Sequence, residues 1–301
     1  MPVFHVIYNP LSGNGKGKDE ALKLKDREEY GQLEFDDITK IGSYKEFFAS
    51  IPEEDKIIIS GGDGTLNRFI NDTEGIEIKN EILYYATGSG NDFAHDIGSD
   101  KDNKPVRINE YLRDLPVVTV KGKSYRFING VGYGIDGYCC EVGDNLRETT
   151  DKPVNYAGIA IKGLLFHFKP ADAVVTVDGV RHEYKHVWLA PAMNGRFYGG
   201  GMMCAPAQDR LGKDKNVSVV VMHGSGKLKT LAVFPSIFKG EHVKNTEMLA
   251  VLPGHDIKVE FSSPCALQID GETILGVSGY EVHTVKSMNA AKEKTAEYAA
   301  K

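Results

Sequence analysis

The chain has 301 residues, 41% hydrophobic and 26% charged, so it is long enough for two ordinary domains and wholesale disorder is excluded. Its 36 Lys and Arg against 42 Asp and Glu give a net charge of −6, which argues against a dedicated nucleic-acid-binding protein. No apolar run reaches the roughly 18–20 residues of a membrane span, and residues 1–10 do not resemble a signal peptide. The four cysteines have no C-x-x-C spacing, so we expect reduced thiols in a cytoplasmic protein.

In the first part of the chain, apolar segments alternate with polar, helix-forming segments. We expect strands at 3–8, 34–41, 56–60 and 82–86. We expect helices at 16–29, 43–50 and 66–71, the second of them capped by Ser43. Strands that alternate with helices predict a parallel sheet with helices on both faces.

The chain becomes rich in strands after about residue 116. Strands are expected at 117–120, 125–129, 173–177, 186–190, 217–222, 257–261, 266–269 and 280–285, with helices at 155–168 and 227–239. We therefore predict an α/β domain over 1–120 and a β-sandwich-like domain over 121–286. Residues 287–301 are polar and helix-prone, and they form either a helix that packs on the first domain or a tail.

Three glycine-rich segments follow predicted strands: NPLSGNGKG at 9–17, SGGDGT at 60–65 and ATGSGNDFA at 86–94. In a parallel sheet, all three loops emerge at the carboxyl edge, where such folds bind ligands. Glycine lets backbone N–H groups approach anionic oxygens, and a helix N-terminus adds partial positive charge there. Neither the Walker A spacing nor the G-x-G-x-x-G spacing fits these segments. They predict a phosphate site of another kind.

The central segment has a simpler explanation as well. Thr65 could act only as a helix N-cap and Asp63 only as a turn former. Three glycines, an acid and a hydroxyl directly after a buried strand are more than a turn requires. The pattern therefore favours a ligand-binding role.

Asn9-Pro10-x-Ser12-Gly13, GGDGT at 61–65 and the G-x-G-N-D-F-A run ending at 94 together resemble the diacylglycerol kinase catalytic-domain family, which includes bacterial lipid kinases and sphingosine kinases. GGDGT is shared with NAD kinases, whereas the other two segments favour lipid kinases. The resemblance implies a NAD kinase/diacylglycerol kinase-like fold, with ATP between the two domains and a lipid site in the second. It implies nucleotide contacts from Asn9, Ser12, Gly61, Gly62, Asp63, Gly64, Thr65, Thr87, Gly88, Ser89, Gly90, Asn91 and Asp92.

Two acids, Asp270 and Glu272, follow the apolar segment 266–269. On an extended strand both carboxylates would face the same way, roughly 6–7 Å apart. This spacing suits one acid that accepts the proton of a substrate hydroxyl and another that helps to hold Mg²⁺. The alternative is a hairpin turn, since Asp178-Gly179 shows that the chain uses Asp-Gly turns. The resemblance favours catalytic acids and leaves open which of them is the base.

Asp136, in the glycine-rich segment 129–137, is a further candidate, and an ordinary glycine-rich hairpin is the alternative. The chain departs from the family pattern in two places. Family members often carry an Asp where residues 116–120 contain no acid, and many bacterial members have a metal-holding Asp-Asp-Gly turn where this chain has the differently spaced segment 205–214. Asp209 and Asp214 remain as candidate metal ligands.

Two segments predict contact with lipid. Residues 227–244 interleave four lysines with six large apolar side chains, and residues 157–168 are apolar with a lysine and a histidine. Such segments suit peripheral docking on an anionic membrane, here the inner face of the cell membrane. The alternative is two amphipathic helices that cover the second domain. No pattern decides between a monomer and a dimer.

The sequence thus predicts an ATP- and Mg²⁺-dependent kinase that phosphorylates a lipid hydroxyl, with diacylglycerol or a related lipid as substrate. A NAD kinase-like enzyme is one alternative, but neither Asn80-Glu81 nor Asn109-Glu110 stands where that reading requires an Asn-Glu motif. A catalytically decayed nucleotide- or lipid-binding regulator is the other. The intact GGDGT and Asp-Gly-Glu sequences argue against decay.

Overall fold

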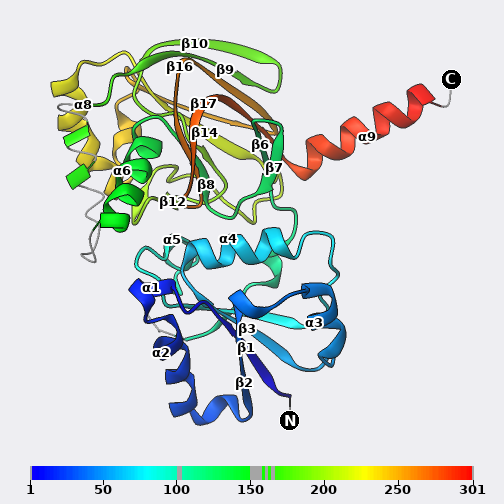
Figure 1. Ribbon diagram of the computed structural model, residues 1–301. Helices are drawn as coiled ribbons and strands as arrows, with labels where there is room; N and C mark the ends of the chain where they lie inside the picture. The colour runs from blue at the N-terminus through cyan, green and yellow to red at the C-terminus, as the bar shows by residue number, and fades with distance from the viewer. Residues whose placement is uncertain (1, 100–103, 150–157, 160–161, 164–166, 300–301) are drawn as a thin grey trace. The chain divides into compact units, whose positions relative to one another are not determined.

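The computed structural model describes residues 2–99, 104–149, 158–159, 162–163 and 167–299 (Figure 1). The chain forms two compact units, Met1–Arg113 and Asp114–Lys301. The first unit contains a largely parallel sheet and the second a large antiparallel sheet, as the predicted fold class requires.

The sheet of the first unit has the order β2-β1-β3-β4-β5. Its strands are β1 (Phe4–Tyr8), β2 (Leu33–Asp37), β3 (Lys56–Gly61), β4 (Glu81–Ala86) and β5 (Val106–Arg107). The first four are parallel and β5 is antiparallel. Tyr8 pairs with Ser60 and Gly61 with Ala86, so β1, β3 and β4 end side by side. The three glycine-rich loops therefore leave the sheet at one edge.

Short helices connect these strands: α1 (Ser12–Gly15), α2 (Gly17–Leu22), α3 (Tyr44–Ser50), α4 (Asp63–Asp72) and α5 (Asp92–Asp96). The Ser43 hydroxyl accepts a hydrogen bond from the Glu46 N–H, as its predicted capping role requires. The helix expected over 16–29 breaks into α2 and two 3₁₀ turns, η1 (Lys23–Asp26) and η2 (Glu28–Tyr30). Further 3₁₀ turns are η3 (Ile38–Lys40) and η4 (Asn109–Leu112).

The second unit is built on a ten-stranded sheet whose strands pair antiparallel. Its strands are β6 (Val117–Val120), β7 (Lys123–Arg126), β8 (Gly130–Tyr133), β9 (Ala171–Val177), β10 (Val180–Val187), β11 (Ala192–Met193), β14 (Val217–Met222), β15 (Leu249–Gly254), β16 (Asp256–Ile269) and β17 (Glu272–His283). A separate small hairpin joins β12 (Phe197–Tyr198) to β13 (Met202–Met203). Because β6 pairs with β17, residues 117–120 belong to this unit rather than to the first domain.

Two apolar cores stabilise the second unit. One lies within the sheet and includes Val131, Val259 and Val282. The other joins the sheet to surrounding helices and includes Trp188, Ile135 and Phe234. Ile135 begins helix α6 (Ile135–Thr149), which the sequence analysis did not predict because its glycines and paired cysteines are poor helix formers.

The remaining elements are α8 (Lys227–Val233), η6 (Phe234–Lys239), η7 (His242–Lys244) and α9 (Val285–Ala299). The single helix expected over 227–239 is thus an α-helix followed by a 3₁₀ helix. Most of the helix expected over 155–168 lies outside the described residues. None of the described helices combines the length and the hydrophobicity that a membrane span requires.

Candidate active site

The loops after β1 and β3 are joined through Asn9. Its side-chain N–H₂ group donates to the Thr65 hydroxyl at 3.1 Å, and its side-chain oxygen accepts from the Leu11 N–H at 3.0 Å. The Ser12 hydroxyl donates to the Asn9 carbonyl at 2.8 Å. Asn9, Ser12 and Thr65, all predicted nucleotide contacts, therefore form one hydrogen-bonded group at the carboxyl edge of the sheet.

The glycines of these loops are required by close packing. A Cβ on Gly61 would lie 2.4 Å from the Thr65 side chain, and a Cβ on Gly88 would lie 2.4 Å from the Gly62 Cα. A Cβ on Gly17 would lie 1.9 Å from the Asn9 carbonyl oxygen. None of these sites admits a side chain without a shift of the backbone, so the loops pack directly on one another.

Asp63 holds the loop after β4 in place. Its two carboxylate oxygens accept hydrogen bonds from the N–H groups of Asp92 and Phe93, at 2.8 and 2.9 Å. These are the first amides of α5, so Asp63 caps that helix from another loop. Asn91 has a left-handed backbone, and its side chain bonds both the N–H and the carbonyl of Gly88. Asp63 and Asn91 thus shape the site.

The start of α4 differs from the start of α5. The N-cap of α4, Gly62, offers no side-chain acceptor, and its carbonyl accepts the N–H groups of Thr65 and Leu66. The Tyr84 hydroxyl donates to the Gly61 carbonyl at 3.1 Å. Burial raises the pKa of Tyr84 well above its usual value, and the charges of Asp63 and Asp92 raise it further. The edge therefore combines an uncapped helix N-terminus with two nearby carboxylates.

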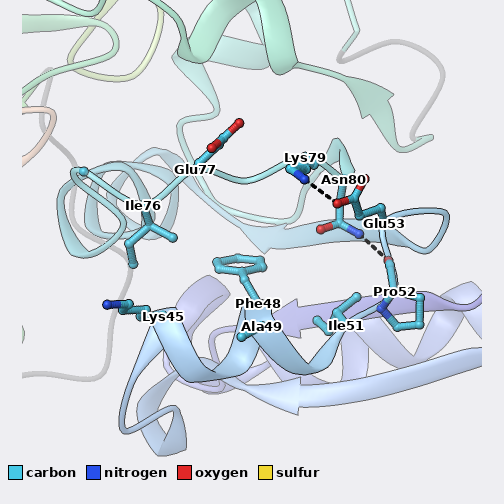
Figure 2. A pocket seen from close by; sticks show the side chains of 11 residues that line it. Lys45, Phe48, Ala49, Ile51, Pro52, Glu53, Ile76, Glu77, Lys79 and Asn80 are labelled. Atoms are coloured by element: carbon cyan, nitrogen blue, oxygen red, sulfur yellow. Dashed lines mark hydrogen bonds and ion pairs between the residues drawn. The ribbon is translucent and has the colours of Figure 1, made fainter.

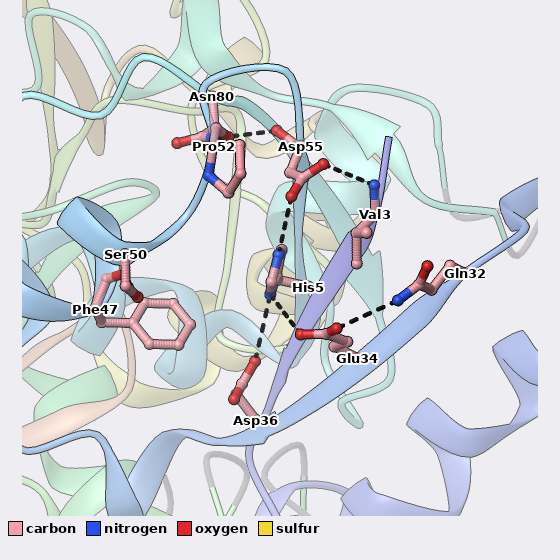
Figure 3. A network of polar contacts seen from close by, with 10 residues as sticks. All are labelled: Val3, His5, Gln32, Glu34, Asp36, Phe47, Ser50, Pro52, Asp55 and Asn80. Carbon is pink, nitrogen blue, oxygen red and sulfur yellow. Dashed lines mark hydrogen bonds and ion pairs between the residues drawn. The ribbon is translucent and has the colours of Figure 1, made fainter. Parts of the chain in front are cut away.

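A cavity and a buried group of polar side chains lie at the opposite, amino edge of the first unit's sheet. A cavity of about 530 Å³ is lined by α3 and by the segments that lead into β3 and β4, with Phe48, Ile51 and Ile76 among its apolar residues (Figure 2). His5 is nine-tenths buried, and its ring nitrogens lie 3.5 Å from Asp55 and 3.6 Å from Glu34 (Figure 3). Neither region contains a predicted site residue.

In the second unit, Asp270 and Gly271 form the two-residue turn between β16 and β17. Both have positive φ angles, 46° and 99°, and Ile269 pairs with Glu272 across the turn. This is the geometry of a tight hairpin. The two acids therefore do not stand on one extended strand, and the alternative interpretation of an Asp-Gly turn is correct for the backbone.

The two acids also differ in their surroundings. The Asp270 carboxylate is buried and accepts hydrogen bonds from the N–H groups of Ile128, Asn129 and Gly130, at 2.6, 2.8 and 2.9 Å. Glu272, two residues later, is exposed. Asp270 thus anchors the segment that enters β8, whereas Glu272 is accessible to a substrate.

Asp136 lies at the start of α6 and lines a narrow pocket of about 40 Å³. Most of the other lining residues are apolar. The full set is Ile135, Cys139, Cys140, Tyr198, Gly199, Met202, Phe234, Phe238 and Gln268. Asp136 is buried, and neither of its carboxylate oxygens has a hydrogen-bond partner. Burial raises its pKa to about 6, against a smaller opposite effect of nearby amides and the Tyr198 hydroxyl. An unpaired buried carboxyl is costly, so it marks a functional candidate.

The strand pair β8–β16 connects this pocket to the Asp-Gly turn. Gln268 lines the pocket, pairs with Gly132, and accepts a hydrogen bond from the Gly271 N–H at 2.7 Å. A Cβ on Gly132 would lie 2.1 Å from an Asp136 carboxylate oxygen and 2.5 Å from the Gln268 amide nitrogen. Sequence reasoning missed Gln268, although its place two residues before Asp270 on an apolar strand was visible.

The predicted metal ligands are not brought together. Asp209 accepts a hydrogen bond from the Leu211 N–H, and Asp214 pairs with Lys286 at 3.4 Å. Within the described part of the chain, no three His, Cys, Asp or Glu side chains are grouped so that they could hold a metal ion. The prediction of a structural metal at Asp209 and Asp214 therefore receives no support from the geometry.

Two family models match the chain. The diacylglycerol kinase catalytic domain matches residues 3–118, and the YegS C-terminal NAD kinase beta sandwich-like domain matches residues 129–286. The chain belongs to the diacylglycerol kinase catalytic-domain family. Both halves match, so the lipid-kinase family that the glycine-rich motifs indicated is confirmed.

Individual relatives of the chain are distant but match along most of its length. A diacylglycerol kinase of Mycobacterium tuberculosis is 25% identical over 254 residues, 80% of each chain. One from Bacillus subtilis is 24% identical over 278 residues, 89% of this chain and 88% of that one. The crystal structure of a diacylglycerol kinase from Bacillus anthracis superposes with a TM-score of 0.58 at 18% identity, covering 94% of this chain and 93% of that one. The structural likeness confirms the fold.

Proposed function

We propose that the protein is an ATP- and Mg²⁺-dependent kinase that phosphorylates the hydroxyl group of diacylglycerol or a closely related lipid. The observation that carries the proposal is the group of glycine-rich loops around Asn9, Thr65 and Asp63, locked together at one edge of the first unit's sheet. Glycine-rich loops that meet a helix N-terminus at the carboxyl edge of a parallel sheet are typical of sites that bind an anionic ligand. A nucleotide phosphate is such a ligand.

In this proposal, the first-turn amides of α4 bind a phosphate of ATP. The helix has ten residues, begins at Asp63 and has no side-chain cap. Its N-terminus therefore offers partial positive charge to an anion. Ser12, Asn9 and the 87–92 loop surround the same edge. Asp63 acts by holding α5, so it is a positioning residue.

The acids at this edge fit a Mg²⁺ ion that is carried by the ATP phosphates. Mg²⁺ commonly takes one or two protein carboxylates, and water and phosphate oxygens complete its shell. Asp92, in the first turn of α5, is the acid that would hold it, because both carboxylate oxygens of Asp63 already accept backbone N–H groups. The ion would neutralise charge on the transferred phosphoryl group.

We assign the general base to Glu272. The Asp270 carboxylate is already held by three backbone N–H groups, whereas Glu272 is exposed at the β16–β17 turn. In the reaction, the lipid hydroxyl oxygen forms a bond to the γ-phosphorus, and its proton passes to Glu272. The bond between that phosphorus and the bridging oxygen breaks, and ADP leaves with the electron pair.

The pocket beside Asp136 is proposed to receive part of the lipid. It is mostly apolar, and Asp136 and Gln268 supply polar groups at one side. At about 40 Å³ it has room for only about two or three water molecules, so a lipid chain requires it to widen. The four cysteines are free, which agrees with the proposed cytoplasmic location, where ATP is also present.

The test is phosphate transfer from [γ-³²P]ATP to a panel of lipids in mixed micelles. The wild type is expected to label diacylglycerol or a relative, and Glu272→Gln and Asp63→Ala are expected to lose the product. Glu281→Gln is the matched control, because Glu281 is a half-buried acid on the same strand β17 that pairs with Lys258 at the surface. Labelled NADP from added NAD, with no labelled lipid, would overturn the proposal. ATP binding without any product would favour a binding protein instead.

A further inference from the structure

The helix pair α8–η6 is firmly attached to the second unit on its inner side. Thr230 is buried, and its hydroxyl bonds that of Ser225 at 2.6 Å. The Ser225 carbonyl in turn accepts from the Trp188 indole at 2.9 Å. Phe234 and Ile237 of η6 are buried in the helix-covered core. The segment is therefore a fixed part of the fold.

Two large apolar side chains of this segment face the solvent. Leu228 is 80% exposed, the highest fraction among the exposed large apolar side chains of the described residues, and Phe238 is 41% exposed. Isolated exposed apolar residues are common, but a leucine almost entirely in water contributes nothing to the core. On this anchored segment, Leu228 and Phe238 therefore present apolar groups directly to the solvent.

The charged residues within the segment itself are all lysines. Lys227, Lys229 and Lys239 are exposed, and residues 226–240 contain no Asp or Glu. Lys229 pairs with Glu247 at 3.0 Å, but both side chains are more than half exposed, so water and salt weaken that pair. A positive surface with projecting apolar side chains complements anionic headgroups above an apolar interior.

The same segment forms part of the pocket wall. Phe234 and Phe238 line the pocket that also contains Asp136, and Met202 contributes from β13. Phe238 is both a wall residue and an exposed one. A lipid that leaves a bilayer at this surface would therefore lie beside the pocket.

We propose that the α8–η6 surface, formed by Lys227, Leu228, Lys229, Phe238 and Lys239, docks on an anionic phospholipid bilayer. The lysines lie among the headgroups, and Leu228 and Phe238 insert below them. The role of this docking rests on the proposed function, because docking would bring the pocket to a lipid substrate in the membrane. The docking itself is measured without any kinase assay.

Vesicle co-sedimentation tests the proposal, with phosphatidylcholine vesicles that contain or lack phosphatidylglycerol. The wild type is expected to bind the anionic vesicles preferentially. Replacement of Lys227, Lys229 and Lys239 by Gln is expected to weaken binding about 100-fold, and Leu228→Ser about 10-fold. Val180→Ser is the control, because Val180 is an apolar side chain, 59% exposed, that lies elsewhere, at the start of β10. This variant is expected to bind like the wild type.

Insertion has a direct signature. In Leu228→Trp the new indole is expected to shift its emission to the blue on anionic vesicles and to be quenched by brominated lipid. Val180→Trp is expected to show neither effect, and the buried Trp188 supplies the constant background. Equal binding of all variants, or no quenching at position 228, overturns the proposal. So does light scattering that shows a dimer abolished by Leu228→Ser, because the surface would then be a subunit interface.

The outcomes separate this proposal from the kinase proposal. If the lysine and Leu228 variants lose vesicle binding while no lipid is phosphorylated in any assay, docking stands and the proposed reaction fails. If lipid in detergent micelles is phosphorylated but vesicle binding is unchanged in every variant, the reaction stands and docking fails. If both proposals hold, Leu228→Ser retains activity in micelles and loses it on vesicles.

Discussion

The loop edge of the first unit and the pocket of the second use carboxylates in opposite ways. Asp63 receives two backbone N–H groups and so joins two loops. Asp136 is buried beside an apolar pocket with no hydrogen-bond partner, and its pKa rises to about 6. Asp270 resembles Asp63, because it too is held by backbone amides. An acid in a conspicuous motif can therefore be a structural anchor rather than a reacting group, and the groups that surround its carboxylate determine its role.

The sharpest test of this contrast compares Glu272 with Asp270. Glu272→Gln is expected to reduce kcat about 1,000-fold, since general-base catalysis typically contributes that much. Its Tm is expected to stay unchanged because the side chain is exposed. Steady-state kinetics beside thermal unfolding checks both. An Asp270→Asn variant that loses activity without losing stability, while Glu272→Gln stays active, would reverse our assignment.

The unpaired state of Asp136 predicts a pH-dependent stability. The folded pKa of Asp136 is about 6, above the unfolded value of about 3.9. The stability that the protein gains from a protonated Asp136 is therefore fully present below pH 4 and is lost as the pH rises through 6. About 3 kcal/mol of the free energy of unfolding is at stake. Asp136→Asn is expected to lack this decline and to be more stable than the wild type at pH 7. Denaturant unfolding between pH 4 and 7 measures it, and parallel curves for the two proteins contradict the prediction.

Asp270→Asn is expected to destabilise the second unit by about 2 kcal/mol, because three N–H groups lose a charged acceptor. Urea unfolding gives the change. Asp256→Asn is a suitable comparison, since Asp256 is exposed on the same strand β16 and is expected to have a much smaller effect. Equal effects of the two substitutions would argue against the anchoring role.

The smallest effect is expected for the stability of Asp63→Asn. The amide retains one acceptor for the start of α5, so the loss is about 1 kcal/mol, typical of a helix cap. The KM for ATP is expected to rise at the same time because the 87–92 loop shifts. Asp72→Asn, an exposed acid at the end of α4, serves as the control. A variant with normal stability and normal KM would remove Asp63 from both roles.

The local sequence was sufficient to predict those features that depend on only a few adjacent residues. The buried strands before each glycine-rich loop, the cap at Ser43 and the family motifs could all be read from neighbouring residues, because burial, capping and tight turns depend on a few adjacent positions. The same reasoning placed Asn9, Ser12 and Thr65 at one edge, since parallel strands end together.

Contacts between distant segments decided the rest. That Asp63 caps α5, that Asp270 holds the segment 128–130, and that Asp136 remains unpaired depend on residues about 30 to 140 positions away, or on a pocket wall drawn from several elements. The Asp-Gly-Glu segment shows the difference best. Its composition predicted two acids close together. Only the pairing of β16 with β17 and β8 showed that Asp270 accepts hydrogen bonds from backbone amides, whereas Glu272 faces solvent. A hydrogen bond to a distant amide leaves no trace in local sequence, because any acid of the right size can accept it.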